Sequence, residues 1–215
     1  MTLLVEPVTR QEAQRDLCYR FNRYHRTVLH DAAAFRFVGG RVSVDFTATH
    51  GLRWRDPGVE RIPAPADLAR WFIAAGLTDS TVPDSASTLR GAHELREALY
   101  RLMRGRVLGA PVDRRAVEVV NRWAAKAPPA VQLTADGKAK RHGAPTAGSL
   151  LALVARDGVD LLGGPHADRL RECASHTCTL LYLDTSRAGS RRWCAMQVCG
   201  SRDKMTRYRR RATAR

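Results

Sequence analysis

The chain has 215 residues, of which 44% are hydrophobic, so it is long enough and apolar enough to bury a globular core, and this excludes an intrinsically disordered chain. No apolar run reaches the roughly 18 residues of a membrane-spanning helix, and the first residues lack the pattern of a signal peptide, so we expect a cytoplasmic protein. The net charge of +15 favours a polyanionic partner.

The first third of the chain is predicted to hold a β-hairpin with one helix before it and one helix after it. A capping-box pattern begins at Thr9, and apolar residues recur at helical intervals after it, which predicts a helix over 9–30. Residues 35–38 and 41–46 flank a Gly-Gly pair and show apolar–polar alternation, which predicts a β-hairpin. Residues 67–75 carry apolar side chains on one face and predict a short helix.

The middle of the chain reads as mainly helical. Ser87 can cap a helix that runs to about residue 106, and Asp113 can cap another that runs to about residue 126. A short strand pair is predicted around residues 131–133, and the helical period returns over 147–162. We therefore expect a mainly α (α+β) fold in which a helical body precedes a small C-terminal module.

Four cysteines in the last fifth of the chain form two identical pairs, each enclosing four residues: Cys173 with Cys178, and Cys194 with Cys199. In a reducing compartment this spacing favours metal ligation, and four thiolates complete the tetrahedral shell of one structural Zn²⁺. Three alternatives remain, namely buried thiols without a metal, an iron–sulfur cluster on the same ligands, and His176 in place of one cysteine. The remaining cysteine, Cys18, is predicted to be an inert buried thiol of the first helix.

The residues around the cysteines predict a compact module. Residues 179–184 have strand character and residues 191–193 return toward Cys194, so the two segments are predicted to form a β-hairpin. Trp193 is predicted to be a packing anchor of the module rather than a platform on which a base stacks. Ser201 is predicted to cap a basic C-terminal helix.

Positive charge is concentrated in the same region. From Cys173 to Arg215 there are ten Lys or Arg and two acids, a net charge of +8, so more than half of the excess charge lies in one fifth of the chain. Such clustering is typical of a surface that binds a polyanion. Six basic residues on or beside the module are predicted to contact nucleic-acid phosphates: Arg187, Arg191, Arg192, Arg202, Lys204 and Arg207.

The segments Leu170 to Cys173, Leu181 to Arg187 and Arg191 to Lys204 combine ligand spacing with a particular Asp, Trp and Gly-x-Arg. In these features the module resembles the CGNR-type zinc fingers at the C-terminus of bacterial proteins of the ABATE family, described as stress-induced transcription regulators. The resemblance extends upstream to about residue 35. The chain departs from the family at Ser201, where the family has Asn, and at Ala48, where the family usually has Asn before Thr.

The resemblance implies three parts: an N-terminal helical extension over 1–34, an ABATE-like helical domain over 35–164 and a zinc finger with a basic helix over 165–215. It further implies a DNA-binding transcription regulator of a stress response, whose helical domain senses a small-molecule effector. An RNA-binding protein and a protein-docking adaptor remain alternatives. No P-loop, dinucleotide-binding loop, metalloprotease motif or nucleophile elbow is present, and structural roles are predicted for Asp45 and Asp184, so we expect no enzymatic activity.

Overall fold

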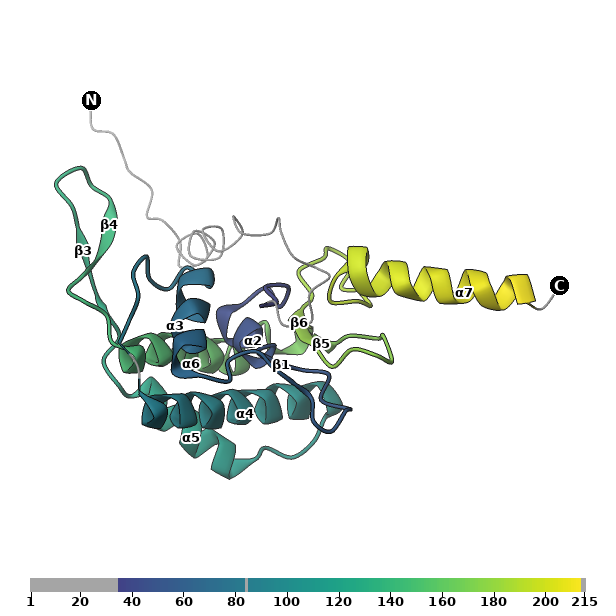
Figure 1. Cartoon of the computed structure of the whole chain (residues 1–215), viewed down its shortest axis with the longest axis horizontal. Coiled ribbons are helices and arrows are strands. Elements are labelled where there is room, and N and C mark those ends of the chain that lie inside the picture. Colours follow the sequence, from purple (N-terminus) through teal and green to yellow (C-terminus); the bar gives the residue numbers. More distant parts are fainter. Residues whose placement is uncertain (1–34, 84, 214–215) are drawn as a thin grey trace.

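A computed structural model describes residues 35–83 and 85–213 of the chain, so the helix predicted over 9–30 lies outside the described residues. Helices dominate the described part, and three antiparallel strand pairs complete it (Figure 1). The α-helices are α2 (Val42–Thr47), α3 (Pro65–Ala74), α4 (Ala86–Leu108), α5 (Arg114–Ala124), α6 (Ala147–Gly163) and α7 (Ser201–Thr213). The mainly helical fold expected from the sequence is confirmed. Among the described residues, no helix is long and apolar enough to cross a lipid bilayer.

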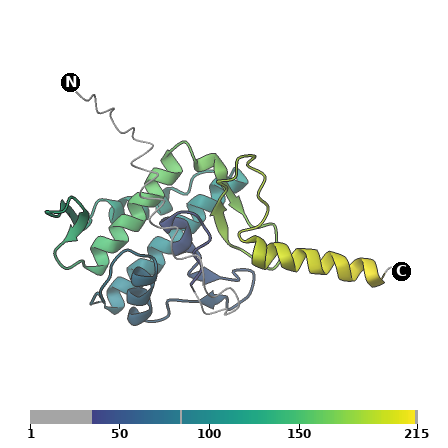
Figure 2. The ribbon, with the colours of Figure 1, turned by 90° about the horizontal axis from the view of Figure 1, so that it is seen from above.

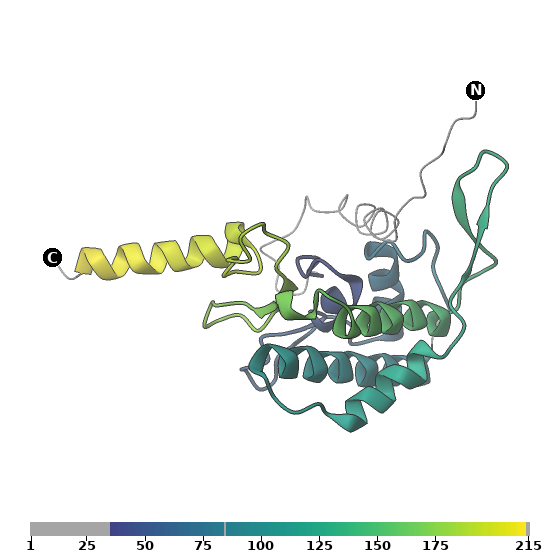
Figure 3. The same ribbon diagram turned by 180° about the vertical axis from the view of Figure 1, so that it is seen from behind.

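Each of the three β-sheets is a two-stranded antiparallel ladder. The strands are β1 (His50–Gly51) with β2 (Val59–Glu60), β3 (Ala130–Leu133) with β4 (Ala139–His142), and β5 (Leu170–Glu172) with β6 (Leu181–Leu183). The β3–β4 hairpin, which confirms the strand pair predicted around residues 131–133, leaves all of β3 exposed. It projects from one end of the molecule, whereas α7 projects from the other (Figure 3).

The core of the helical body, defined as the described residues between 35 and 164, is built where α4, α5 and α6 pack against one another. Helices α2 and α3 also pack against α4. The largest buried side chains include Trp71, Phe46, Leu95, Leu99, Leu150 and Leu151. Each fully buried side chain of this size contributes roughly 1.5–3 kcal/mol of hydrophobic free energy, so this layer of helices is the main source of stability.

Four predicted helices are confirmed, with boundaries set by local caps. The helix predicted over 67–75 is α3, and the helix predicted over 147–162 is α6. The Asp113 side chain caps α5 by accepting a hydrogen bond from the Ala116 amide at 3.1 Å, as predicted. Helix α4 is capped two residues earlier than expected, since Ser85 rather than Ser87 accepts from the Thr88 amide.

The β-hairpin predicted over residues 35–46 is wrong, because the second half of this segment is helix α2. Two acidic side chains favour the helix. Asp45 accepts a hydrogen bond from the Gly39 amide at 2.7 Å and so folds the preceding loop onto the helix. Asp157, from α6, accepts from the amide of Ser43 at 2.9 Å and from its hydroxyl at 2.5 Å, and thus supplies the N-terminal cap that Arg41 does not. The decisive cap therefore comes from 114 residues away in the chain.

The C-terminal module, defined as residues 165–213, shares its core with the helical body. Leu170 of β5 and Leu181 and Leu183 of β6 belong to the same buried cluster as the helices. The Leu183 amide also donates a hydrogen bond to the carbonyl of Gly39 at 2.8 Å. One face of the β5–β6 hairpin is therefore part of the body, and α7 projects from the same side of the body as the hairpin (Figure 2). The cysteines belong to a separate buried cluster.

Candidate metal centre

The first cysteine pair lies in the turn of the β5–β6 hairpin. Cys173 follows β5, and its amide donates to the carbonyl of Leu180 at 2.9 Å, which extends the strand pairing beyond β5 and β6. The Cys178 amide donates to the carbonyl of Ser175 at 2.9 Å and closes a tight turn between the two cysteines. The hairpin thus holds both sulfur atoms at its turn.

The second pair lies where the irregular chain enters the C-terminal helix. Cys194 precedes a π-helical turn (Met196–Gly200), and Cys199 lies inside this turn. The Cys199 amide donates to the carbonyl of Ala195 at 3.0 Å, and this bond curls the chain so that both sulfur atoms of the second pair face the first pair.

The four sulfur atoms have the separation that a tetrahedral zinc site requires. All four sulfur atoms lie within 4.8 Å of one another. The Sγ atom of Cys194 is 3.8 Å from the Sγ atom of Cys178 and 3.7 Å from that of Cys199. With zinc–sulfur bonds of about 2.3 Å, the edge of a regular tetrahedron is about 3.8 Å. The distances are too long for disulfides, and all four cysteines are free thiols. The group contains cysteines only, and His176 lies exposed in the turn between Cys173 and Cys178.

Crowding of the four sulfur atoms also creates a need for a cation. Hydrogen bonds from the other thiols lower the pKa of Cys173, and the resulting thiolate raises the pKa of Cys194. Full deprotonation of the group therefore requires positive charge at its centre. A divalent ion that prefers four sulfur ligands meets this requirement, so the residues fit one structural Zn²⁺. Such an ion would tie the hairpin to the π-helical turn and leave no coordination position open.

Tyr182 and Arg191 support the metal centre by packing beside the cysteines. Tyr182 is fully buried beside the cysteines, and its hydroxyl donates to the carbonyl of Arg191. The Arg191 guanidinium lies 4.5 Å above the Tyr182 ring and donates to the carbonyls of Trp193, at 2.8 Å, and Cys194. Arg191, predicted as a phosphate contact, thus uses its side chain to fix the path of the chain into the second cysteine pair.

Asp184 has the structural role predicted for it. Its fully buried carboxylate accepts hydrogen bonds from the amide and hydroxyl of Ser186, at 2.9 and 2.6 Å, and from the Arg191 amide at 2.9 Å. Burial alone would raise the pKa of Asp184, but these hydrogen bonds lower it below its usual value. The charged carboxylate therefore folds the loop that joins the two halves of the module.

Two local predictions about the module are wrong. Residues 191–193 do not form a strand, because the bonds to Asp184 and the Arg191 side chain hold them in an irregular path, and β6 pairs with β5 instead. Ser201 does not cap the C-terminal helix. It is the first residue of α7, and its hydroxyl donates to the carbonyl of Met196 at 3.2 Å. The π-helical turn that contains Cys199 instead runs directly into α7.

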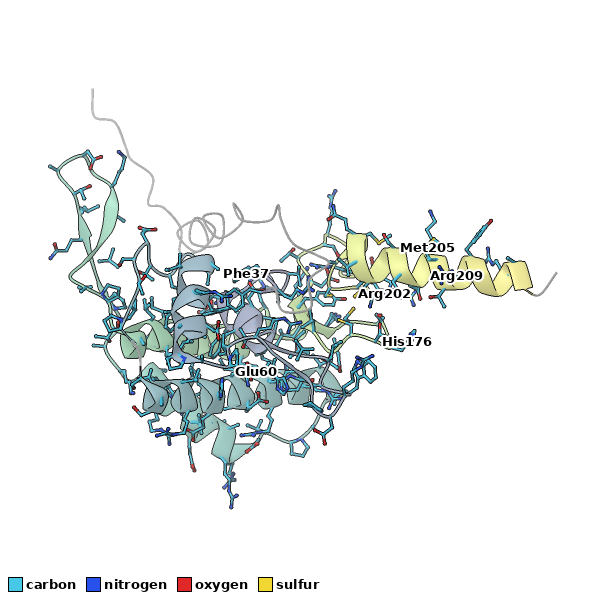
Figure 4. The ribbon with its side chains drawn as sticks, in the orientation of Figure 1. Phe37, Glu60, His176, Arg202, Met205 and Arg209 are labelled. Carbon is cyan, nitrogen blue, oxygen red and sulfur yellow. The ribbon has the colours of Figure 1, made fainter. Side chains whose placement is uncertain are left out.

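The other residues predicted to contact phosphates lie around the metal centre. Arg187, Arg192 and Lys204 are exposed. Arg202 is exposed as well and donates to the hydroxyl of Thr177 at 3.1 Å, so it connects α7 to the first cysteine pair. Figure 4 shows Arg202 and His176 at the same end of the molecule. The side chain of Arg207 lies outside the described part of the structure.

The four cysteine ligands were predicted from the sequence, but some of the residues that support the site were not. Trp193 packs against the cysteine cluster, as predicted, and the Arg192 guanidinium lies 4.9 Å above its ring. Tyr182 lies within the segment Leu181 to Arg187 that carries the resemblance, but no role was predicted for it, and Thr177 lies in none of these segments. A tyrosine in the strand between the cysteine pairs is the one signal in the sequence that could have marked Tyr182 as a support of the site.

Comparison with family models agrees with this architecture. Residues 40–165 match the ABATE family, described as "Putative stress-induced transcription regulator", and residues 169–212 match the CGNR zinc finger. A search of curated proteins found no match to the chain. The ABATE match covers more than half of the chain, and the four clustered cysteines lie within the finger match. The chain therefore belongs to the ABATE family, and its C-terminal module is a CGNR zinc finger that holds one structural zinc ion.

Proposed function

We propose that the protein is a DNA-binding transcription regulator in which the zinc finger presents α7 to duplex DNA. The observation that carries this proposal is the setting of α7. The helix leaves the metal centre directly through the turn that contains Cys199, and it projects away from the body (Figure 1). Its sequence has one acidic residue, Asp203, against six Lys or Arg. A cationic helix fixed at one end and open on its sides fits a DNA groove.

The exposed cations beside the helix supply the phosphate contacts in this proposal. Arg187 and Arg192 lie on the finger, and Arg202 and Lys204 lie in the first turn of α7, with Arg207 one turn further along. The bond from Arg202 to Thr177 keeps the first turn close to the first cysteine pair. Arg191 takes part indirectly, since it positions the second cysteine pair.

We propose further that the helical body modulates this binding and that the protein acts by binding rather than by catalysis. Two hollows on the described part of the body are open to solvent, one beside Ser85 and Thr146 and the other beside Val112 and Glu118. An effector of the body would therefore bind at an open surface or create its pocket on binding. The regulatory effect of such an effector would reach α7 through the core that the body shares with β5 and β6.

Selection of bound sequences from random duplex DNA tests the function. The zinc-loaded full-length protein should enrich a defined motif, whereas the Cys194→Ser/Cys199→Ser variant should enrich none because α7 loses its anchor. Titration of the same protein with structured RNA at matched salt separates the two nucleic acids. Equal or tighter binding to RNA would contradict the DNA proposal in favour of RNA. Binding that is insensitive to salt would instead indicate a protein-docking surface.

A further inference from the structure

We infer that the loop joining β1 and β2 in the helical body is a second DNA contact, made by Trp54 and Arg55 next to the zinc finger. This inference rests on the proposed function and extends it, since it assigns part of the DNA surface to the body rather than to the finger alone.

The loop is built so that these two side chains face outward. Trp54 is 50% exposed, whereas Trp71 and Trp123 are 0% and 7% exposed. Leu52 has a φ of 50°, a left-handed conformation that is unfavourable for a leucine, and its carbonyl accepts from the Arg55 amide at 2.8 Å. The turn thus presents about half of a large aromatic side chain to solvent, and backbone strain of this kind is typical of functional loops.

Arg53 anchors the base of the loop inside the body. Its guanidinium donates to both carboxylate oxygens of Glu97, at 2.5 and 3.2 Å, and lies 3.9 Å above the Tyr100 ring. Burial alone would raise the pKa of Glu97, but Arg53, together with Arg96, lowers it to about 2, so the pair stays charged at neutral pH. The loop is therefore fixed at its base. Arg53 points inward, whereas the next two residues, Trp54 and Arg55, are exposed.

The loop adjoins the surface that we assign to DNA. The Arg53 amide donates to the hydroxyl of Thr179 at 3.3 Å, directly after Cys178. Two residues earlier, Thr177 accepts from Arg202 of α7. Figures 1 and 2 show the β1–β2 connection at the end of the molecule from which α7 projects. Hydrogen bonds thus connect the base of the loop and the first turn of α7 to the residues on either side of Cys178.

The chemistry of the loop suits a nucleic acid. The Arg55 guanidinium lies 4.7 Å above the Trp54 ring, so a planar cation and a planar aromatic group are presented together. An indole can stack on a base or pack on a deoxyribose, while the guanidinium pairs with a phosphate. Asp56 is also exposed and offsets the charge of Arg55, so the aromatic contact, rather than net charge, carries the attraction.

Tryptophan emission of the zinc-loaded full-length protein tests the inference. Duplex DNA should quench the emission and protect the exposed tryptophan from acrylamide, and Trp54→Phe should remove most of this change. Trp54→Ala should weaken binding by about fivefold or more, as for other stacking aromatics, whereas Trp54→Phe should retain most of the affinity. Leu133→Ala is the matched control, since Leu133 is 78% exposed on the hairpin at the opposite end.

The outcomes separate this inference from the proposed function. Wild-type binding that is lost in Lys204→Glu but unchanged in Trp54→Ala would overturn the role of the loop and leave the role of the finger standing. An equal loss in Trp54→Ala and Leu133→Ala would also overturn it, because the effect would then not be specific to this surface. If the wild type does not bind duplex DNA at any salt concentration, both proposals fail.

Discussion

Asp45 shows how one carboxyl group links the helical body to the zinc finger. Its oxygen accepts from the Gly39 amide, and the Gly39 carbonyl in turn accepts from the Leu183 amide of β6. Burial, together with the nearby Asp157 carboxylate, raises the pKa of Asp45 to about 8, although the amides of Gly39 and Val38 lower it. The neutral acid is therefore the form that the folded protein favours.

The titration of Asp45 should make stability depend on pH. The pKa of Asp45 is higher in the folded protein than in the unfolded chain. The stabilising contribution of its neutral form to the free energy of unfolding is therefore fully present below about pH 4 and is lost as the pH rises toward 8. Asp45→Asn keeps a neutral acceptor for Gly39 and should unfold at a higher urea concentration than the wild type at pH 8 but not at pH 4. A variant that shows the same difference from wild type at both pH values would refute this assignment.

Arg191 is the residue whose loss should affect the metal centre most specifically. Removal of its guanidinium frees the carbonyls of Trp193 and Cys194 and uncovers the Tyr182 ring. We expect Arg191→Ala to weaken the finger by about 1–3 kcal/mol, visible as faster zinc transfer to a colorimetric chelator. Arg187→Ala removes an exposed residue of the same charge from the same module and serves as the control. Identical transfer rates in the two variants would show that Arg191 does not support the site.

At the scale of elements, helices with local signals could be predicted and contacts between distant residues could not. Helices α4 and α5 combine an apolar stripe with a serine or aspartate cap, and both the period and the cap are written in adjacent residues. Helix α2 has only six residues and receives its cap from Asp157, so its apolar alternation looked like a strand. The irregular path of residues 191–193 likewise depends on Asp184.

The four zinc ligands, in contrast, could be predicted from spacing, because each pair needs only a local turn to bring its two sulfur atoms together. The hairpin that carries the first pair could not be predicted, because its strand partner precedes the cysteines rather than lying between the pairs. The inward orientation of the Arg191 side chain could not be predicted either, because the carbonyls to which it donates are backbone groups without a sequence signature.

Helix α2 should depend on its distant cap. Asp157 accepts from Ser43 and also pairs with Arg41 at 2.7 Å, so Asp157→Ala leaves the buried Ser43 amide without its cap and removes one of the two carboxylates that bind Arg41. We expect a loss of about 2 kcal/mol in the free energy of unfolding, measured in urea. Asp160→Ala removes the more exposed carboxylate that binds Arg41 and should cost less. Equal losses would argue that Arg41 pairing, not capping of α2, is what Asp157 provides.

At the scale of the whole molecule, the finger and the body should unfold together. Leu170, Leu181 and Leu183 lie in the core of the body, and the same hairpin ends in Cys173 and Cys178. Removal of zinc from the full-length protein should therefore lower the midpoint of a single thermal transition by at least about 5 °C. Cys173→Ser/Cys178→Ser should reproduce this shift without chelator. Two separate transitions, with that of the body unchanged by chelator, would contradict the shared core.

The central claim is that zinc holds α7 in position to bind duplex DNA. Fluorescence anisotropy of a labelled duplex, measured over a range of salt concentrations with zinc-loaded and with metal-stripped full-length protein, tests this claim most directly. The zinc-loaded protein should bind with an affinity that falls steeply with salt, by about 0.9 in the logarithmic slope for each phosphate contact, and the metal-stripped protein should lose most of this binding. Binding that is the same with and without zinc, or no binding by the zinc-loaded protein at low salt, would contradict the account.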